Sequence, residues 1–430
     1  MKATRVGVVL AGVVLCASGC SNPFDPPEAG TPAGDSATEA TAEPEDTDPG
    51  EGGDSDDADE DWDETFTIVS TGDVLIHTNV IDSAETGDGY DFAPLMEPVA
   101  EWISGADLAL CSLEVPIKPA GEEPVGYPVF GAPPELIPSL AEVGFHGCNT
   151  ATNHSLDSGV EGLERTLDTF DEHGMGHVGT ARTEAEAASP QLYTLQRGDR
   201  EITVAHLSTT ELHNDPFYPP QDAPWMVTDD DPEVLTDMAA QAREEGADVV
   251  VASVHWGEEY VHEPGPEQIQ YAEALAAGGE IDLIYGNHSH TPQPIEQLDG
   301  GPGDEGVWVV WSMGNFLSNQ DEQCCVMETA TGTMAVATVE APEGEPARVT
   351  ALEWAPVTVD RGPEDEDGHR GIWPLLDLYE DGAPEPVELD EATIQRRWER
   401  IAEVMGEDSL RTDPPEPTGE DPEVIPRTQD

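Results

Sequence analysis

Residues that commonly bind metal ions recur along this sequence directly behind apolar segments. Six side chains share this setting: Asp73, Glu114, Asn153, His255, His288 and His290. Two carboxylates, one amide oxygen and three imidazoles, without thiolates, suit Mn, Fe, Zn and similar first-row ions. They offer more donors than one tetrahedral ion uses, whereas two ions about 3.5–4 Å apart and bridged by a carboxylate would use them naturally. The residue types therefore predict a centre for two divalent metal ions, with Mn, Fe and Zn all left open.

The chemistry that such a centre supports is hydrolysis. Two ions lower the pKa of bound water, so that hydroxide forms near neutral pH, and they hold both oxygens of an in-line displacement. A histidine beside the ions but free of them can donate a proton to the leaving group. His154, which directly follows Asn153, is a fourth imidazole behind the same predicted strand, and the residues alone leave open whether it binds metal. Each residue alone also has a local explanation: Asp73 could cap a turn, and Asn153 could form an Asx turn. The metal site is favoured because the clusters recur in order, each behind a strand.

The apolar segments themselves predict an α/β fold. Eight of them read as short strands: Phe66–Ser70, Leu108–Cys111, Phe145–Asn149, Ile202–Leu207, Val249–Val254, Ile281–Tyr285, Val307–Trp311 and Thr333–Val339. Apolar residues at helical spacing lie between several of them, for example Val160, Leu163 and Leu167. This alternation predicts a layered α/β domain over residues 65–360 with a mixed sheet. Ligands bind beyond the carboxyl ends of parallel strands, so the six side chains are expected to converge there.

The N-terminus predicts export. Lys2 and Arg5 precede an apolar run, Val6–Leu15, and small residues then lead to Cys20. This order resembles a bacterial lipobox, which predicts a signal peptide over residues 1–19, lipidation of Cys20 and a lipid anchor on the outer face of the cell membrane. The alternative is ordinary cleavage after Gly19, which leaves a secreted protein. No other apolar stretch approaches the roughly 18 residues that span a bilayer.

Charge and composition define the remaining regions. The chain has 91 Asp and Glu against 16 Lys and Arg, a formal charge of -75, which argues against nucleic acid as a partner. Residues 20–64 are acidic and poor in large apolar side chains, which predicts a disordered linker. Residues 361–412 are expected to be an extension with one amphipathic helix, Ala392–Met405, and residues 413–430 a disordered tail.

Several motifs taken together point to a family. In order, the segments GDVLIH, SLEVP, TNHSLDSG, VHWGEEY, GNHSHTPQ and SMGNF resemble those of the CapA family of poly-γ-glutamate capsule synthesis proteins, within the calcineurin-like metallophosphatase superfamily. The resemblance covers about residues 65–360. It implies a four-layer α/β/β/α sandwich that carries a two-metal centre.

The resemblance also implies roles for individual residues. It assigns Asp73 and His290 to the first metal and Glu114 to the bridge between the metals. Asn153, His255 and His288 are implied as further ligands and His154 as the proton donor. Asp157 and Glu259 are implied to orient histidines. The sequence departs from the superfamily pattern at three positions. The superfamily has a D-x-H motif, whereas the nearest histidine after Asp73 is His77, four residues on. Glu114 replaces the Asp of many phosphatases, and Ser112 replaces an Asn.

These observations predict a surface-anchored, metal-dependent hydrolase of the phosphoesterase type. Its expected task is the synthesis, export or anchoring of poly-γ-glutamate or a related anionic polymer, with that polymer or its machinery as partner. The alternative is a non-catalytic member of the capsule machinery, whose metal centre binds polymer carboxylates or only stabilises the fold. Cys111, Cys148, Cys324 and Cys325 allow three disulfide connectivities, which the sequence does not distinguish.

Overall fold

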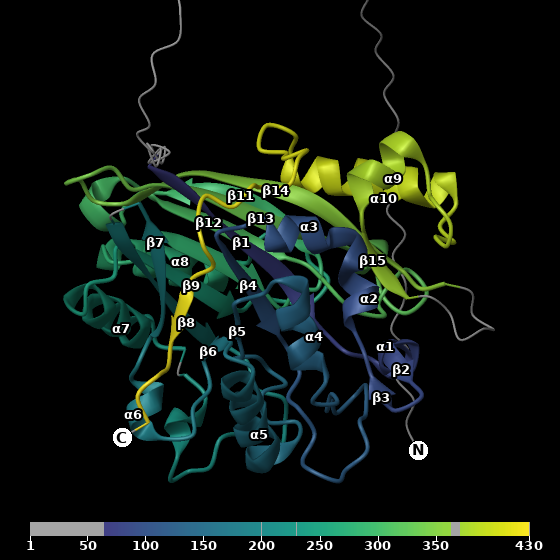
Figure 1. Ribbon diagram of the computed structural model, residues 1–430, viewed down its shortest axis with the longest axis horizontal. Coiled ribbons are helices and arrows are strands. Elements are labelled where there is room, and N and C mark those ends of the chain that lie inside the picture. The colour runs from purple at the N-terminus through teal and green to yellow at the C-terminus, as the bar shows by residue number, and fades with distance from the viewer. Residues whose placement is uncertain (1–63, 199, 229, 363–369, 430) are drawn as a thin grey trace, which may run out of the picture. The chain divides into compact units, whose positions relative to one another are not determined.

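Two seven-stranded sheets form the centre of the molecule (Figure 1). The computed structural model describes residues 64–198, 200–228, 230–362 and 370–429, so the predicted signal peptide, Cys20 and nearly all of the acidic linker lie outside the described residues. In the order in which they pair, the strands of the first sheet are β15 (Gly371–Pro374), β14 (Arg348–Asp360), β13 (Thr331–Glu340), β1 (Thr65–Val74), β4 (Leu108–Leu113), β5 (Gly147–Asn149) and β6 (Gly176–Val178). Strands β1, β4, β5 and β6 are parallel to one another, and the others pair antiparallel.

The second sheet repeats this plan. In pairing order its strands are β11 (Pro292–Leu298), β12 (Val307–Met313), β10 (Leu283–Asn287), β9 (Val249–His255), β8 (Arg200–Thr210), β7 (Gln191–Arg197) and β16 (Glu423–Ile425). Strands β12, β10, β9 and β8 are parallel, with antiparallel strands at both edges. All seven residues of β9 are buried, as expected for an apolar run in the covered interior of a parallel sheet. Each predicted strand overlaps an observed one, and six of the eight fall within it; the predicted strands at 145–149 and 281–285 each begin two residues before β5 and β10.

Helices cover the outer face of each sheet. The helices are α1 (Thr78–Ala84), α2 (Ala93–Met96), α3 (Ala100–Ser104), α4 (Leu136–Val143), α5 (Gly159–Glu172), α6 (Glu184–Ala187), α7 (Pro232–Glu244), α8 (Pro266–Gly278), α9 (Leu375–Asp381) and α10 (Glu391–Met405), and β2 (Glu85–Thr86) pairs with β3 (Gly89–Tyr90) in a small hairpin. None of the described helices is both long and apolar enough to cross a membrane.

Three apolar cores separate four layers. One core lies between the sheets and joins Phe66 and Leu108 of the first sheet to Val249 and Leu283 of the second. A second core packs α2, α3 and α4 against the outer face of the first sheet. A third packs α7 and α8 against the outer face of the second sheet. The predicted four-layer α/β/β/α sandwich is therefore confirmed.

The C-terminal region differs from the expectation drawn from the sequence. Strand β15 lies beyond residue 360 yet pairs with β14, so the fold does not end at 360. The extension contains α9 in addition to the expected α10. Both β15 and α9 are short and lie in a Pro-rich region, so their periodicity is too brief to be recognised.

The predicted disordered tail is ordered as well. Strand β16 pairs with β7, and the chain runs along the second sheet to end near α6 (Figure 1). Buried Asp107 accepts hydrogen bonds from Arg197 Nη2 at 2.6 Å and from the backbone N of Thr418 at 2.7 Å. Arg427 is also buried and donates to the backbone oxygen of Thr180 at 2.9 Å. Buried arginines stabilise this segment, and composition alone does not reveal them.

A close backbone contact joins the two sheets where their carboxyl ends meet. The backbone N of Asp73 donates to the oxygen of Gly314, and the N of Phe316 donates to the oxygen of Asp73, both at 2.9 Å. A Cβ atom on Gly72 would lie 2.1 Å from the oxygen of Gly314. Only glycine at position 72 permits this approach, which brings the end of β1 beside the loop that follows β12.

Candidate metal centre

The six predicted metal ligands lie together at the carboxyl ends of parallel strands. Asp73 is the second-last residue of β1, and Glu114 directly follows β4. Asn153 lies in the loop after β5, His255 ends β9, and both His288 and His290 follow β10. All six side chains are buried, which sets them apart from ordinary polar loop residues. Two sheets therefore contribute to one site, the first with carboxylates and an amide and the second with imidazoles.

Two sets of three donors meet around Glu114. Asp73, Glu114 and His290 form one set, here called the Asp73 group. Glu114, His255 and His288 form the other, the His255 group. Within each group the donor atoms lie within 4.8 Å of one another. Glu114 thus belongs to both groups, and its carboxylate could serve as a ligand in either.

The distances within the groups agree with shared ligation. His290 Nε2 lies 3.7 Å and His255 Nε2 lies 3.8 Å from Glu114 Oε1. His288 Nδ1 is 3.2 Å from His255 Nε2, and Asn153 Oδ1 is 3.0 Å from the same His255 nitrogen. Asn153 thus adds an amide oxygen to the surroundings of the His255 group.

Three buried polar atoms of the site lack the protein partners that such atoms normally have. Both carboxylate oxygens of Glu114 and Nδ1 of His255 have no hydrogen-bond partner among the described residues. A buried, unpaired carboxylate is costly. A divalent cation would satisfy these atoms, so the residues present fit a metal ion.

The protonation preferences also suit metal binding. Burial lowers the pKa of His288 to about 3 and that of His255 well below its ordinary value, so both imidazoles are neutral, as ligands must be. Burial raises the pKa of the Glu114 carboxyl well above its ordinary value. Burial also opposes a charge on His290, but the nearby carboxylates of Glu114 and Asp73 outweigh it and raise the pKa of His290 to about 9. Without a cation, these shifts favour a proton on His290 or Glu114.

The backbone at the imidazole ligands is in an unusual conformation. His288 has φ 90° and His290 has φ 56°, both in the left-handed region that favours glycine. Each such residue costs on the order of 1–3 kcal/mol and persists where surrounding contacts enforce it. One such contact is the hydrogen bond from the backbone N of His288 to Asp73 Oδ2, at 3.2 Å. Strain of this kind concentrates at functional sites.

A second set of contacts orients the ligands. Ser112 Oγ donates to Asp73 Oδ1 at 3.1 Å and accepts from Asn149 Nδ2 at the same distance. Asn315 Oδ1 lies 3.1 Å from His290 Nδ1, and its amide nitrogen donates to the backbone oxygen of Thr329 at 2.9 Å. If His290 Nδ1 donates to Asn315, Nε2 is the nitrogen left for a metal ion.

His154 lies beside the two groups without belonging to either. Its Nδ1 is 2.6 Å from Asp157 Oδ2, which also accepts from the backbone N of Phe130 at 2.7 Å. The amide nitrogen of Asn214 lies 3.4 Å from His154 Nε2, and Asn153 Nδ2 donates to Asn214 Oδ1 at 3.4 Å. Asp157 therefore orients His154, and Asn214 connects it to Asn153.

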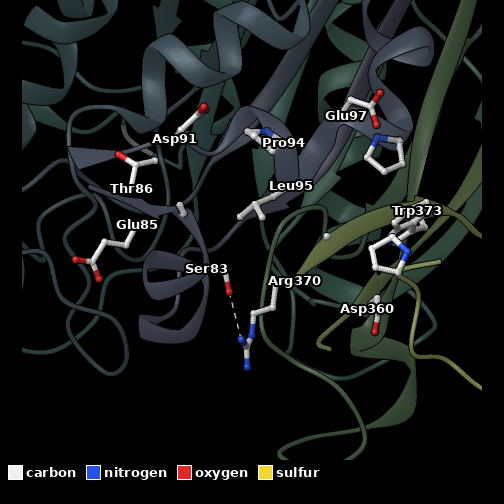
Figure 2. A pocket seen from close by; sticks show the side chains of 14 residues that line it. Ser83, Glu85, Thr86, Asp91, Pro94, Leu95, Glu97, Asp360, Arg370 and Trp373 are labelled. Carbon is white, nitrogen blue, oxygen red and sulfur yellow. Dashed lines mark hydrogen bonds between the residues drawn. The ribbon is translucent and has the colours of Figure 1, made fainter. Parts of the chain in front are cut away.

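A cavity of about 570 Å³ opens onto this arrangement, and Asn153, His154 and His290 line it. Another cavity, of about 280 Å³, lies between Ser83, Trp373 and Arg370 (Figure 2). The residues that line this second cavity include none of the predicted site residues. The first cavity is therefore the candidate substrate site.

Comparison with known proteins bears on this arrangement. The profile of a family described as "Bacterial capsule synthesis protein PGA_cap" matches residues 67–320, which include every donor from Asp73 to His290 as well as Asn315. The chain belongs to this family. The PGA biosynthesis protein CapA of Bacillus subtilis (strain 168) is 30% identical over 224 residues, covering 50% of this chain and 56% of the relative. The capsule biosynthesis protein CapA of Bacillus anthracis is 24% identical over 306 residues, covering 67% and 70%.

The match to the Bacillus subtilis relative thus spans little more than half of that protein's length. Among solved structures, the calcineurin-like phosphoesterase YfkN from Bacillus subtilis is similar, with a TM-score of 0.40 and 15% sequence identity. That likeness covers 79% of this chain and 97% of the other.

The histidine noted as a departure from the D-x-H motif lies apart from the donors of this PGA_cap family member. His77 lies outside both donor groups, its Nδ1 is 3.0 Å from the backbone oxygen of Leu75, and burial lowers its pKa to about 4. Glu259 was expected to orient a histidine, but its side chain is exposed at the edge of the cavity and none of the described hydrogen bonds joins it to one. It lies beyond β9 in a turn beside the cavity that His154 and His290 also line, and its orienting role stays a prediction.

Sequence reasoning missed Asn214 and Phe130, which contact His154 and Asp157 from loops without a periodic pattern. It also left Asn315 without a role, although the position of Asn315 behind the strand at 307–313 matches that of the other donors.

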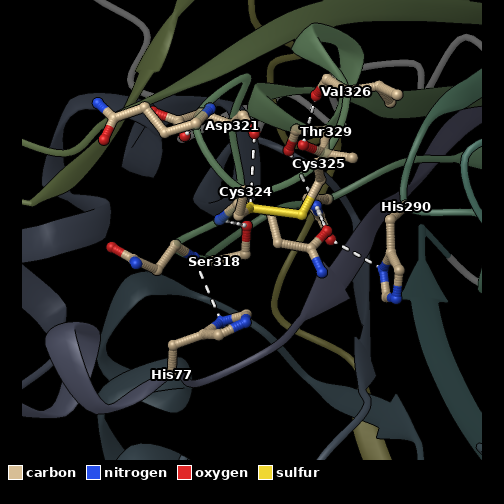
Figure 3. The surroundings of a disulfide bond; sticks show 12 residues. His77, His290, Ser318, Asp321, Cys324, Cys325, Val326 and Thr329 are labelled. Atoms are coloured by element: carbon tan, nitrogen blue, oxygen red, sulfur yellow. Dashed lines mark hydrogen bonds between the residues drawn. A yellow bond between two sulfur atoms is a disulfide. The ribbon is translucent and has the colours of Figure 1, made fainter. Parts of the chain in front are cut away.

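The structure pairs the four cysteines in one of the three allowed ways. Cys111 is bonded to Cys148 between neighbouring positions of β4 and β5, with Cα atoms 4.4 Å apart. Cys324 is bonded to Cys325. Figure 3 shows this second bond in the segment that also reaches His77, through the backbone N of Asn319 at 3.4 Å from His77 Nδ1.

Proposed function

We propose that this member of the capsule synthesis family is a metal-dependent hydrolase of the phosphoesterase type. Its proposed task is the synthesis, export or anchoring of poly-γ-glutamate or a related anionic polymer. The observation that carries the proposal is that two donor groups share Glu114, whose two buried oxygens lack partners. The names of the two Bacillus relatives, which refer to PGA and capsule biosynthesis, support the polymer context.

In this proposal the Asp73 group holds one divalent ion, and the His255 group with Asn153 holds the other. Ions of the Mn, Fe or Zn type would supply a low pKa for water and neutralise negative charge on the substrate. The carboxylates of Asp73 and Glu114 lie deep in the site, whereas Asn153 also faces the cavity. A substrate in the cavity therefore meets the centre from the side of Asn153 and His290.

His154 is proposed as the proton donor to the leaving group. Asp157 accepts a hydrogen bond from Nδ1, so the proton that His154 transfers is carried on Nε2. The edge of the Phe130 ring contacts the His154 ring, with ring centroids 4.8 Å apart, and limits its rotation. His154 lines the cavity beside Asn153, where a leaving group would lie.

Lipidation of Cys20 and attachment to the outer face of the cell membrane form part of the proposal. The supporting feature is the order of charged, apolar and small residues before Cys20. Replacing Cys20 with Ala should release the protein from the membrane fraction into the medium or block its processing. Membrane attachment that is unchanged in Cys20→Ala would contradict the anchor.

The hydrolase proposal is tested with the purified chain loaded with Mn, Fe or Zn and supplied with aryl phosphate monoesters and diesters. His154→Ala should lower turnover by about 10²–10⁴-fold while metal content stays unchanged. Asn153→Ala should weaken metal retention and turnover together. If both variants turn over these substrates like the wild type, the activity does not belong to this site.

A non-catalytic role is the second candidate, and the position of His77 favours it. This histidine, the nearest one to Asp73 in the sequence, lies outside the Asp73 group. The metal centre would then bind polymer carboxylates or stabilise the fold. This candidate would be supported over the hydrolase if the protein retained two ions, turned over no phosphate ester and bound glutamate oligomers saturably.

A further inference from the structure

Three loops form the walls of the cavity beside the metal centre. The first, residues 125–131, lies between β4 and α4. The second, residues 213–218, follows β8, and the third, residues 259–260, follows β9. Any part of a substrate that does not contact the metal ions must lie between these loops. Their side chains therefore determine which substrates fit.

The first loop presents an aromatic surface on a rigid base. Tyr127 is 77% exposed, and its ring lies 6.3 Å from that of Phe130, which in turn contacts His154. Val125 and Gly131 exchange two backbone hydrogen bonds of 2.9 Å, and the N of Phe130 is held by Asp157. An exposed ring on a fixed loop beside a proton donor is a contact surface for a flat or apolar group.

Aromatic residues also line the other two walls. Phe217 comes from the second loop and Tyr260 from the third. The ring of Tyr260 lies 6.2 Å from that of His290, and its backbone N donates to the oxygen of Ser289 at 2.8 Å. The cavity thus has aromatic groups on every wall, close to the site where the reacting bond would lie.

The charges in the cavity oppose a second anion. The residues that line the cavity include no lysine or arginine, whereas Asp215 and Glu259 both line it with exposed side chains. His77 is uncharged at neutral pH because burial lowers its pKa to about 4. Apart from His154, whose charge as proton donor is paired with Asp157, the metal ions would be the strong attraction for an anion among the described lining residues, and the reacting group would occupy them.

We infer that the cavity accepts a substrate with a single anionic reacting group attached to a flat group that is uncharged or cationic. This inference rests on the proposed phosphoesterase function and names the substrate class of that site. The interior of a polyglutamate chain does not belong to this class, because its further carboxylates would lie against Asp215 and Glu259. A low-charge building block, linkage or chain end of the polymer system does belong to it.

The test compares phosphate diesters with one common leaving group, nitrophenolate, and different retained groups: phenyl, dicarboxyphenyl, trimethylammoniophenyl and methyl. At low salt the phenyl and trimethylammonio esters should have a kcat/KM about tenfold above that of the dicarboxyphenyl ester, given two like charges several ångströms away. About 1 M salt should remove most of this difference. The double variant Asp215→Asn with Glu259→Gln should remove it at low salt by raising kcat/KM for the dicarboxyphenyl ester.

Tyr127→Ala tests the aromatic surface separately. It should lower kcat/KM for the phenyl ester several-fold and leave the methyl ester nearly unchanged. Equal rates for all retained groups at low salt, or equal effects of Tyr127→Ala on phenyl and methyl esters, would overturn the inference while the hydrolase proposal stands.

Calorimetric binding provides a readout that needs no turnover. Phenylphosphonate should bind the metal-loaded chain more tightly than dicarboxyphenylphosphonate, and the Asp215→Asn, Glu259→Gln variant should reduce that preference. Selective binding without hydrolysis of any ester would refute the hydrolase but retain the inferred specificity. Absent or unselective phosphonate binding would overturn the inference.

Discussion

Replacing Glu114 with Gln removes one negative charge from the residue that both donor groups share. The amide keeps nearly the same shape, so packing is preserved, but each ion loses a carboxylate ligand. We expect the affinities for both ions to fall together. By contrast, Asp73→Asn changes only the Asp73 group and should affect one ion.

The magnitude follows from the linkage between binding and folding. An ion present at a hundred times its Kd stabilises the folded state by about 2.7 kcal/mol, so two ions contribute about 5 kcal/mol. With an unfolding entropy of about 2.1 cal/mol/K for each of roughly 360 residues, this raises the Tm by about 7 °C. If Glu114→Gln raises the Kd of both ions by about 100-fold, the ions stabilise the folded state by only about 0.8 kcal/mol, and they raise the Tm by only about 1 °C.

The assay is thermal unfolding with chelator and with Mn, combined with elemental analysis of the desalted protein. Glu135→Gln is the matched control, because Glu135 also has a buried, unpaired carboxylate oxygen but belongs to neither donor group. The wild type and Glu135→Gln should keep two ions and the full rise in Tm. Two ions and a full rise in Glu114→Gln would refute the shared bridge.

Three further predictions concern the fold around the site. Gly72→Ala should lower the free energy of unfolding by about 1–3 kcal/mol and lower the metal content, because the added Cβ would meet the oxygen of Gly314. The control Gly87→Ala, at a position with open space around it, should change neither quantity. Equal stabilities of the two variants in chemical denaturation would contradict this prediction. Burial lowers the pKa of His206 to about 3, so this histidine stays neutral in the folded state while the unfolded state takes up a proton below its ordinary value of 6.5. The stability that neutral His206 contributes is fully present above pH 6.5 and is lost as the pH falls toward 3. Between about pH 7 and pH 5, the free energy of unfolding of His206→Gln should therefore fall by about 2 kcal/mol less than that of the wild type. Parallel pH profiles of the free energy of unfolding would contradict this. Removing residues 413–430 should destabilise the protein by about 2 kcal/mol or more, because buried Asp107 loses the donor Thr418 and the backbone oxygen of Thr180 loses the donor Arg427. An unchanged Tm would show that this segment is not part of the fold.

The parallel strands and the metal donors could be predicted because one physical rule governs both. A strand covered on both faces is a continuous apolar run, as in Val249–His255. The residue after such a run lies at the carboxyl edge of the sheet, where parallel strands bring their ends together. Asp73, Asn153 and His290 were found in this way, although they are far apart in the sequence.

The remaining features depend on contacts that leave no local pattern. Strand β16 is only three residues long, and its place depends on pairing with β7 and on buried arginines such as Arg427. Asn214 reaches His154 from a loop, and its partner is 60 residues away. The exposure of Glu259 was not foreseen either, because spacing cannot tell an exposed carboxylate at a turn from a buried one.

The metal centre itself is tested most directly by anomalous diffraction from crystals of the Mn-loaded protein. Two anomalous peaks should lie on opposite sides of the Glu114 carboxylate, one beside Asp73 and His290 and the other beside His255 and His288. Peaks that do not contact Glu114, or a site that stays empty when Mn is abundant, would contradict the two-ion centre.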